Sequence, residues 1–142
     1  MPAIAAIARQ ADIDELTEAL GVTIEDALLA GIRDSLNARQ IVVDGQVVAV
    51  FGDAVFSLLG GVGVPWLIST IHVQKHPRAF LQVCKPEVQQ MLTRHHHLMN
   101  YVDARNTAAI RWLKWLGFKF EPAAPYGARR FLFHKFTLNR ED

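Results

Sequence analysis

The chain has 142 residues, of which 51% are hydrophobic and 20% charged, a composition that predicts one folded domain over residues 1–142 and excludes a disordered chain. The formal net charge is +1 with histidine neutral, so we expect no general attraction to nucleic acid or to an anionic membrane. The single cysteine excludes an internal disulfide, and no uncharged apolar run reaches the roughly 18 residues that a membrane helix needs.

The N-terminal part of the chain predicts a short strand followed by a helix. The apolar run over residues 3–8 is typical of a strand. Asp12 is a favourable helix N-cap, and Glu15, three residues later, is the reciprocal partner of a capping box. Gly21 is predicted to end this helix in a left-handed turn.

A second helix and a hairpin are predicted next. Thr23 is a favourable N-cap. Valine-rich runs over residues 40–44 and 46–51 flank Asp44-Gly45, a dipeptide that predicts a tight turn between two strands. The helix is expected to bury one stripe of apolar residues that recur every four positions, namely Ile24, Leu28, Ile32 and Leu36.

The second half of the chain alternates strands and helices. After the glycine-rich segment 60–63, residues 66–73 are predicted to form a buried strand. A helix is expected to begin at His76-Pro77, and Pro86 is predicted to kink or split it. This order predicts an α/β fold with one mixed central sheet flanked by helices. Further strands are expected over residues 98–102 and 130–138, with a helix over residues 106–116 between them.

The segment from Asn106 to Phe118 carries the most specific motif. Asn106 is a favourable N-cap, Ala109 is small on the packing face, and Gly117 supplies the left-handed turn that ends the helix before Phe118. An Asn, an Ala three residues later and a Gly-Phe pair at the helix end resemble the GNAT N-acetyltransferases. The resemblance implies a GNAT-like acyl-CoA N-acyltransferase fold, with acetyl-CoA as cofactor and an amine-bearing acceptor.

Members of that family bind the cofactor pyrophosphate with a short stretch after the fourth strand, of the form Gln/Arg-x-x-Gly-x-Gly/Ala. Residues 74–79 align with it, and Gln74 and Ala79 match. Pro77 replaces the central glycine and has no N–H, so the loop is degenerate and one phosphate donor is missing. The resemblance implies that the strand backbone and the residues beside the loop bind the cofactor, namely Ile71, Val73, Gln74, Lys75, Arg78, Ala79 and Asn106.

The catalytic groups typical of the family are only partly present. Many GNAT enzymes protonate the leaving thiolate with a Tyr seven residues after the motif Asn, and that position is Leu113 here. The strand predicted over residues 66–73 has no carboxylate to act as a base, and His72 is its only titratable side chain. Tyr101, on the following strand, is the only nearby phenol. His72 and Tyr101 are therefore the candidate catalytic residues.

A narrower resemblance involves short segments spread over the chain. They are similar to a family of small phage GNAT-like proteins that includes an internal virion protein of short-tailed phages: Phe51-Gly52, Ser57-Leu58-Leu59, Gly63, Pro65-Trp66, Lys75-His76 and residues 112–118. This resemblance implies a phage or prophage protein in the cytoplasm of the infected bacterial host, or packaged in the virion. Two functions stay open: an N-acetyltransferase with a degenerate loop, and a non-catalytic GNAT-fold protein that contacts phage virion proteins.

Other residues that suggest chemistry have simpler explanations. Three consecutive histidines, His95 to His97, would point about 100° apart on a helix and could not converge on one metal ion. We therefore expect a solvated helix end there and no metal site. Cys84 is expected to be a buried thiol. Of Trp112 and Trp115, three residues apart, one is expected in the core and the other exposed.

Overall fold

The structure is a computed structural model that describes residues 8–57 and 59–141. Its strands and helices occur in the predicted order, with two short strands, Lys119–Phe120 and Ala124–Tyr126, that the sequence does not predict. In chain order they are α2 (Gln10–Ile13), the π-helix η1 (Asp14–Ala19), α3 (Ile24–Asp34), β1 (Ser35–Val43), β2 (Gln46–Ser57), β3 (Val62–Ser69), the 3-10 helix η2 (Ile71–Lys75), α4 (Pro77–Arg94), β4 (His97–Asp103), α5 (Thr107–Trp115), β5 (Lys119–Phe120), β6 (Ala124–Tyr126) and β7 (Phe131–Asn139).

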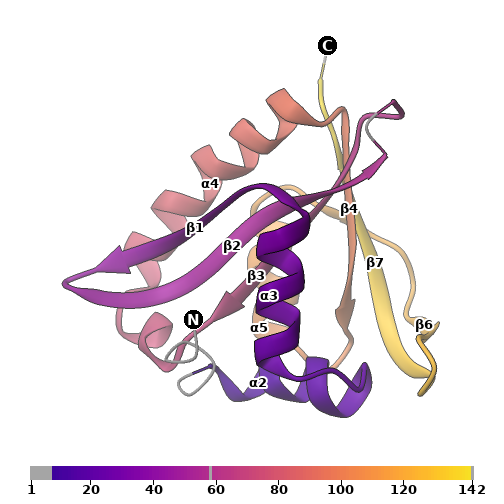
Figure 1. The fold of residues 1–142 in the computed structure, drawn as a ribbon, viewed down its shortest axis with the longest axis horizontal. Helices are drawn as coiled ribbons and strands as arrows, with labels where there is room; N and C mark the ends of the chain where they lie inside the picture. The colour runs from indigo at the N-terminus through magenta and orange to yellow at the C-terminus, as the bar shows by residue number, and fades with distance from the viewer. Residues whose placement is uncertain (1–7, 58, 142) are drawn as a thin grey trace.

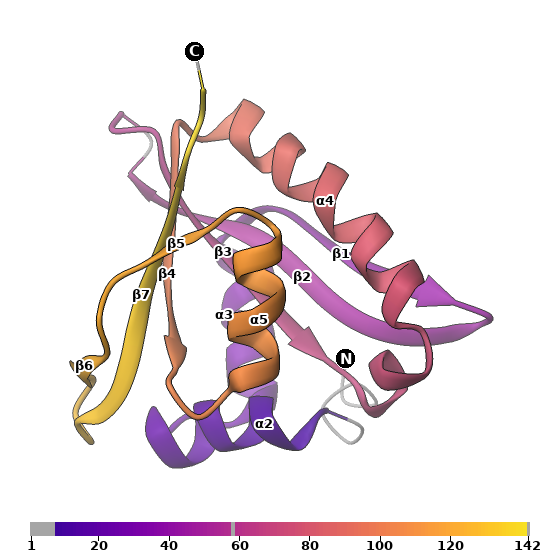
Figure 2. The same ribbon diagram turned by 180° about the vertical axis from the view of Figure 1, so that it is seen from behind.

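The strands of the described chain form one sheet with helices on both faces. The strand order is β1-β2-β3-β4-β7-β5, and β6 pairs with β7. All neighbouring strands run antiparallel except β3 and β4, which run parallel. Helix α3 covers one face, while α4 and α5 cover the other (Figures 1 and 2). The predicted α/β fold with a mixed sheet is confirmed.

The hairpin and the cap of α3 agree with the local sequence signals. Asp44 and Gly45 have φ angles of 51° and 74°, the left-handed pair that a tight turn between β1 and β2 needs. The Thr23 hydroxyl accepts a hydrogen bond from the Asp26 N–H at 3.1 Å and so begins α3. Leu36 does not continue the buried stripe, because α3 ends at Asp34 and Leu36 lies in β1 with 55% of its surface exposed.

The larger core lies between the sheet and helices α4 and α5.

Pro86 is exposed and does not split α4, which is continuous over Pro77–Arg94. Its ring is exposed, and because proline has no N–H it removes one hydrogen bond from the helix. None of the described helices is long and apolar enough to cross a membrane. Cys84 is buried as predicted, and burial raises the pKa of its thiol to about 12.

The two tryptophans of α5 behave as their spacing predicts. Trp112 packs edge-on against Phe80 of α4, with ring centroids 5.5 Å apart. Trp115 is 49% exposed, and the Lys85 ammonium lies 4.6 Å from the centroid of its ring. Trp112 is partly buried and helps join α4 to α5 at the edge of the core, whereas Trp115 forms part of the surface.

The third strand is shorter at its C-terminal end than predicted. It ends at Ser69, and residues 71–75 form the 3-10 helix η2. Thr70 causes the change, because its hydroxyl accepts the His72 N–H at 3.2 Å and donates to the Val47 carbonyl at 2.6 Å. The predicted strand over residues 3–8 lies outside the described residues except for Ala8, which forms an isolated antiparallel bridge with Thr70.

The histidine cluster is not the solvated helix end that the sequence predicts. His95 is only 2% exposed, and its Nε2 lies 2.7 Å from Oδ2 of the buried Asp53. The Arg94 guanidinium donates two hydrogen bonds to the same carboxylate, at 2.8 and 2.9 Å. A single distant carboxylate, Asp53, which lies 41 residues from Arg94 and 42 from His95 in the sequence, therefore binds this helix end, and the run of histidines alone cannot indicate it.

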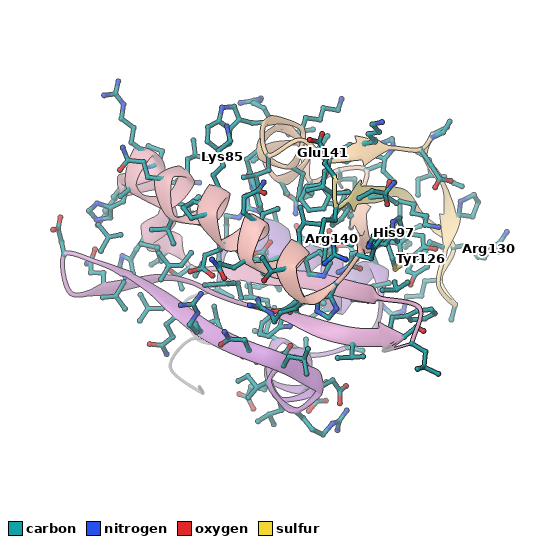
Figure 3. The ribbon with its side chains drawn as sticks, turned by 90° about the horizontal axis from the view of Figure 1, so that it is seen from above. Lys85, His97, Tyr126, Arg130, Arg140 and Glu141 are labelled. Atoms are coloured by element: carbon teal, nitrogen blue, oxygen red, sulfur yellow. The ribbon has the colours of Figure 1, made fainter. Side chains whose placement is uncertain are left out.

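The other two histidines of the cluster turn toward the C-terminal segment. Nδ1 of His96 lies 2.8 Å from Nη2 of Arg140, and His97 contacts the side-chain oxygen of Asn139. Figure 3 shows His97 and Arg140 close together, next to the end of α4. Within the described residues, no group of three or more His, Cys, Asp and Glu side chains could hold a metal ion.

Candidate active site

The parallel strands β3 and β4 separate soon after they meet. They pair only at Val62 with His97 and at Gly63 with Leu98, and Figure 2 shows them diverging from that end. The result is a V-shaped gap in the middle of the sheet. Because strand backbone that faces such a gap has lost its ladder partners, its N–H and C=O groups need other partners or remain available to a ligand.

The carboxamide of Asn100 bridges the narrow part of the gap. Its Nδ2 donates to the Pro65 carbonyl at 2.7 Å, and its Oδ1 accepts the Tyr101 N–H at 2.7 Å. Asn100 therefore replaces one rung of the missing ladder with a side chain. The strands diverge beyond Asn100, and the Pro65 carbonyl and the Tyr101 N–H both still have a hydrogen-bond partner.

Two carboxylates of the N-terminal helical segment close the wide part of the gap. Oδ2 of Asp12 accepts the Ser69 N–H at 2.8 Å and the Ser69 hydroxyl at 2.7 Å. Oε1 of Glu15 accepts the Asp103 N–H at 2.8 Å. The predicted capping box is therefore wrong: Arg9 occupies the N-cap position without a side-chain cap, and both carboxylates bind distant strands instead.

The Arg9 guanidinium lies at the centre of these contacts. Its Nε donates to the Ser69 hydroxyl at 2.9 Å, and its Nη2 donates to Asp12 at 3.2 Å and to Oδ1 of Asn106 at 3.1 Å. Its backbone N–H donates to the Ser69 carbonyl at 2.9 Å. Asn106 also caps α5 as predicted, accepting the Ala109 N–H at 3.4 Å. One cation thus connects β3, α2 and the start of α5.

Leu67 is the residue of β3 whose backbone remains open toward the gap. The carbonyls of Pro65 and Ser69 both face away from β2, because Asn100 and Arg9 bind them from the gap side. Backbone groups alternate between the two edges of a strand in an antiparallel pair. Leu67 lies midway between these residues, so its N–H and C=O point into the gap at a level where β4 has already diverged.

A cavity of about 350 Å³ occupies the gap and continues on both sides of the sheet. Trp66 and Tyr101 contribute aromatic walls, and Asn106 lies at one end. Four carboxylates line the cavity, and no lysine or arginine does so among the described residues. The four are Asp12, Glu15, Asp34 and Glu87.

A second cavity, of about 220 Å³, lies beside the first at the start of α4. Leu67 and Trp112 line both cavities, so the two meet at the open backbone of β3. Arg9, Gln74 and Pro77 also line the second cavity. A long ligand could therefore extend from the α4 N-terminus, along Leu67, into the gap between β3 and β4.

Glu15 has the most perturbed carboxyl group of the larger cavity. Burial raises its pKa from 4.5 to about 7, and the nearby charges of Asp12 and Asp103 act in the same direction. The hydrogen bonds from the Asp103 N–H and from Asn106 act against this rise. A carboxyl that exchanges its proton near neutral pH is suited to acid–base chemistry.

The residues predicted to bind a cofactor are only partly brought together. The prediction that the backbone of Ile71 and Val73 continues the strand is wrong, because both lie in η2. Val73 and Gln74 do line the smaller cavity. Asn106 lines the larger cavity. Lys75, Arg78 and Ala79 line neither cavity: the first two are exposed at the end of η2 and the start of α4, and Ala79 is in the first turn of α4.

The two predicted catalytic residues lie apart. His72 is in η2 and not on a strand, and it lines neither cavity; its buried Nδ1 has no hydrogen-bond partner in the part of the chain that the structure describes. Tyr101 lines the larger cavity, but its ring stacks on Tyr126 of β6 with centroids 4.0 Å apart. Tyr126 belongs to the β6–β7 side of the molecule, away from Lys85 on α4 (Figure 3).

Leu113 holds the position where the resemblance places a proton donor. Its side chain is 7% exposed and packs in the core between the sheet and the helices. Arg9, Asp12 and Glu15 belong to the site in the structure but are not predicted to do so from the sequence. The one available signal was the pair of carboxylates at i and i+3, which equally fits a local cap.

Two parallel strands that diverge within a mixed sheet, followed by a loop that leads into a helix, are the framework of the GNAT acetyltransferases. This chain has the GNAT fold. Over 98% of its length it superposes on 93% of a ribosomal-protein-alanine N-acetyltransferase from Brucella melitensis, with a TM-score of 0.68 and 19% identity. No family model and no curated protein matches the sequence.

Two further solved structures share the fold. An acetyltransferase of the GNAT family from Streptococcus pneumoniae matches with a TM-score of 0.62 and 11% identity, over 83% of this chain and 76% of that one. A variant of the spermidine N-acetyltransferase of Vibrio cholerae matches with a TM-score of 0.59 and 14% identity, over 82% and 73%. At these identities the likeness defines the fold.

Proposed function

We propose that the protein is an acetyl-CoA-dependent N-acetyltransferase with a degenerate phosphate loop. The observation that carries this proposal is the open backbone of Leu67, which lies where the two cavities meet inside the splayed strands. An amide-containing arm laid along β3 there would pair with that N–H and C=O, as a further strand would. The acetyltransferases that share the fold support the same function.

The residues around the smaller cavity fit acetyl-CoA with one donor fewer than usual. The N–H groups of Arg78 and Ala79, in the first turn of α4, have no helical partner and face the space before the helix. Pro77 contributes none. The exposed cations of Lys75 and Arg78 would add charge for phosphate oxygens. When bound, acetyl-CoA would supply an acyl group activated as a thioester.

The charges of the two cavities differ in a way that suits two substrates. The exposed cations Lys75 and Arg78 lie near the start of α4, where the anionic phosphates would bind. Carboxylates line the larger cavity. Arginines pair with three of these carboxylates, Asp12, Asp34 and Glu87, so the carboxylate of Glu15 is the group that favours an ammonium ion over an anion. The acceptor we expect is accordingly a primary amine. The spermidine N-acetyltransferase with the same fold is consistent with an amine-bearing acceptor.

Thermal melting with acetyl-CoA tests the proposal directly. A ligand at about 100 times its dissociation constant stabilises the folded state by roughly 2.7 kcal/mol, so a clear rise in the melting temperature is expected. ATP at the same concentration is the control, because it shares the nucleotide phosphates but lacks the pantetheine arm. Release of free thiol in the presence of a panel of amines then reports turnover. No shift at millimolar acetyl-CoA would overturn the proposal.

The non-catalytic function has its own supporting observation. Side chains of this chain already bind the backbone on both sides of Leu67, through Asn100 at Pro65 and through Asp12 and Arg9 at Ser69. A scaffold that no longer binds a cofactor would keep such contacts. In that case the protein would be a phage or prophage component, present in the cytoplasm of the infected host or packaged in the virion. Its detection in purified virions, together with no response to acetyl-CoA, would favour this function.

A further inference from the structure

We propose that Glu15 is the catalytic base, which takes a proton from the ammonium group of the acceptor inside the larger cavity. This inference rests on the proposed function, since it needs an amine acceptor and an acyl donor. It replaces His72 in that role, because His72 lies in η2 and lines neither cavity.

The position of Glu15 is fixed by the strand that it contacts. Its Oε1 accepts the Asp103 N–H at 2.8 Å, so the carboxyl is held at the wide end of the gap between β3 and β4. A second hydrogen bond comes from the side chain of Asn106. Glu15 lines the cavity together with Trp66 and Tyr101, whose rings provide apolar walls for the carbon skeleton of an acceptor. A base held in this way needs little reorganisation when an amine arrives.

The neighbouring carboxylates are already engaged, which leaves Glu15 for the proton transfer. Asp12 accepts hydrogen bonds from the Ser69 N–H and hydroxyl and from Arg9. Asp103 forms an ion pair with Arg105 at 2.7 Å. Among the described residues, no lysine, arginine or histidine forms an ion pair with Glu15. A carboxylate paired with a fixed cation would hold its charge too firmly to act as a base near neutral pH.

The charges that face Glu15 come from three elements. Asp12 of α2 and Asp103 of β4 disfavour its ionised form, and Arg9 and Arg105 form ion pairs with those two acids. Asn106 at the start of α5 donates to Glu15 and opposes the effect. Burial dominates, so the carboxyl of the cofactor-free protein is expected to gain and lose its proton near neutral pH.

The proton and bond changes balance without any further reactant. The acceptor enters as an ammonium ion, and the Glu15 carboxylate takes one of its protons to leave a neutral amine. The amine nitrogen then forms a bond to the acyl carbon as the bond from that carbon to sulfur breaks. The second proton lost by nitrogen goes to the departing sulfur, and the Glu15 carboxyl returns its own proton to water.

The test compares Glu15→Gln with Glu18→Gln. Glutamine keeps an oxygen that can accept the Asp103 N–H but cannot take up a proton. Glu18 is the matched control, because it is one turn along the same segment, is exposed and pairs with Arg105 at the surface. We expect kcat/KM of the wild type to rise with pH near neutrality, and Glu15→Gln to lower kcat/KM by at least about 100-fold and to remove that rise. Glu18→Gln should keep both.

Two measurements separate this inference from the proposed function. In the cofactor-free protein, the carbon-13 NMR signal of the Glu15 carboxyl should titrate near neutral pH and not near the value of an ordinary glutamate. The melting shift given by acetyl-CoA should be unchanged in Glu15→Gln. Turnover that is unaffected in Glu15→Gln, or a Glu15 titration at the ordinary value, would overturn the role of Glu15 while leaving the acetyltransferase proposal intact. Failure of the wild type to bind acetyl-CoA would overturn both.

Discussion

Asp12 and Glu15 lie three residues apart, and each accepts a backbone N–H from a different one of the two diverging strands. Asp12 binds Ser69 of β3 and Glu15 binds Asp103 of β4, both at 2.8 Å. One turn of the N-terminal helical segment therefore spans the wide end of the gap. The width of the gap and the position of this segment are coupled, so a change in either carboxylate should alter both stability and the shape of the larger cavity.

Replacing Asp12 should be strongly destabilising. Asp12→Ala leaves the Ser69 N–H and the Arg9 guanidinium without their carboxylate partner in a mostly buried site. We expect a loss of about 3 kcal/mol in the free energy of unfolding, as for other broken buried ion pairs. Urea denaturation measures this change.

The matched control for this change is Asp14→Ala. Asp14 is in the same helical segment, and its carboxylate accepts an exposed hydrogen bond from Gln10. Its replacement should change the stability by less than about 0.5 kcal/mol. Equal effects of the two substitutions would contradict the bridging role of Asp12.

The titration of Glu15 should make stability depend on pH. Its pKa is about 7 in the folded protein and 4.5 when exposed, so between these values the folded state binds more protons than the unfolded state. The contribution of Glu15 is therefore complete below pH 4.5 and is lost as the pH rises to about 7, a change of roughly 3 kcal/mol. Glu15→Gln cannot titrate, so its stability relative to the wild type should rise over this range. Urea denaturation at several pH values would show no such divergence if Glu15 had an ordinary pKa.

Restoring an N–H at residue 77 should strengthen cofactor binding. Pro77→Ala adds one donor at the first turn of α4 while keeping a side chain, and we expect the dissociation constant of acetyl-CoA to fall about tenfold. Isothermal titration calorimetry measures this directly. Pro86→Ala is the control, since Pro86 is exposed in the same helix and far from its start. An affinity that is equal for both variants would show that residue 77 does not contact the phosphates.

Gly63 and His95 should be energetically coupled. A Cβ added at Gly63 would overlap the His95 ring, which is held by its contact with Asp53. Gly63→Ala should therefore destabilise the fold by about 2 kcal/mol or more. In the double variant with His95→Ala the ring is absent, so the two effects should fall short of additivity by at least about 1 kcal/mol. Strict additivity in urea denaturation would contradict this account.

Local signals in the sequence predicted the elements that local contacts build. The Thr23 cap and the Asp44-Gly45 turn each depend on residues within three positions, and the structure has both. The motif from Asn106 to Gly117 likewise follows from its own cap and its own left-handed ending, with φ of 101° at Gly117. Local contacts are therefore enough to predict where these particular elements begin and end.

The site depends on contacts that no local pattern reveals. Asp12 binds a partner 57 residues away, and Glu15 a partner 88 residues away. The sequence spacing of these two acids is identical to that of a capping box, so the local interpretation was available and wrong. Burial by distant elements also determines the environment of the His95 side chain, whose partner Asp53 lies 42 residues earlier. Chemistry assembled across a sheet needs the three-dimensional structure.

The single open residue on β3 limits how a bound arm can be positioned. Strand pairing repeats every two residues, so a chain along a long open edge could slide from one register to the next. Here the position before Leu67 is closed by Asn100 at Pro65, and the position after it is closed by Arg9 at Ser69. Anything that pairs with β3 in the gap therefore has one register, and that register determines which of its atoms reaches Glu15.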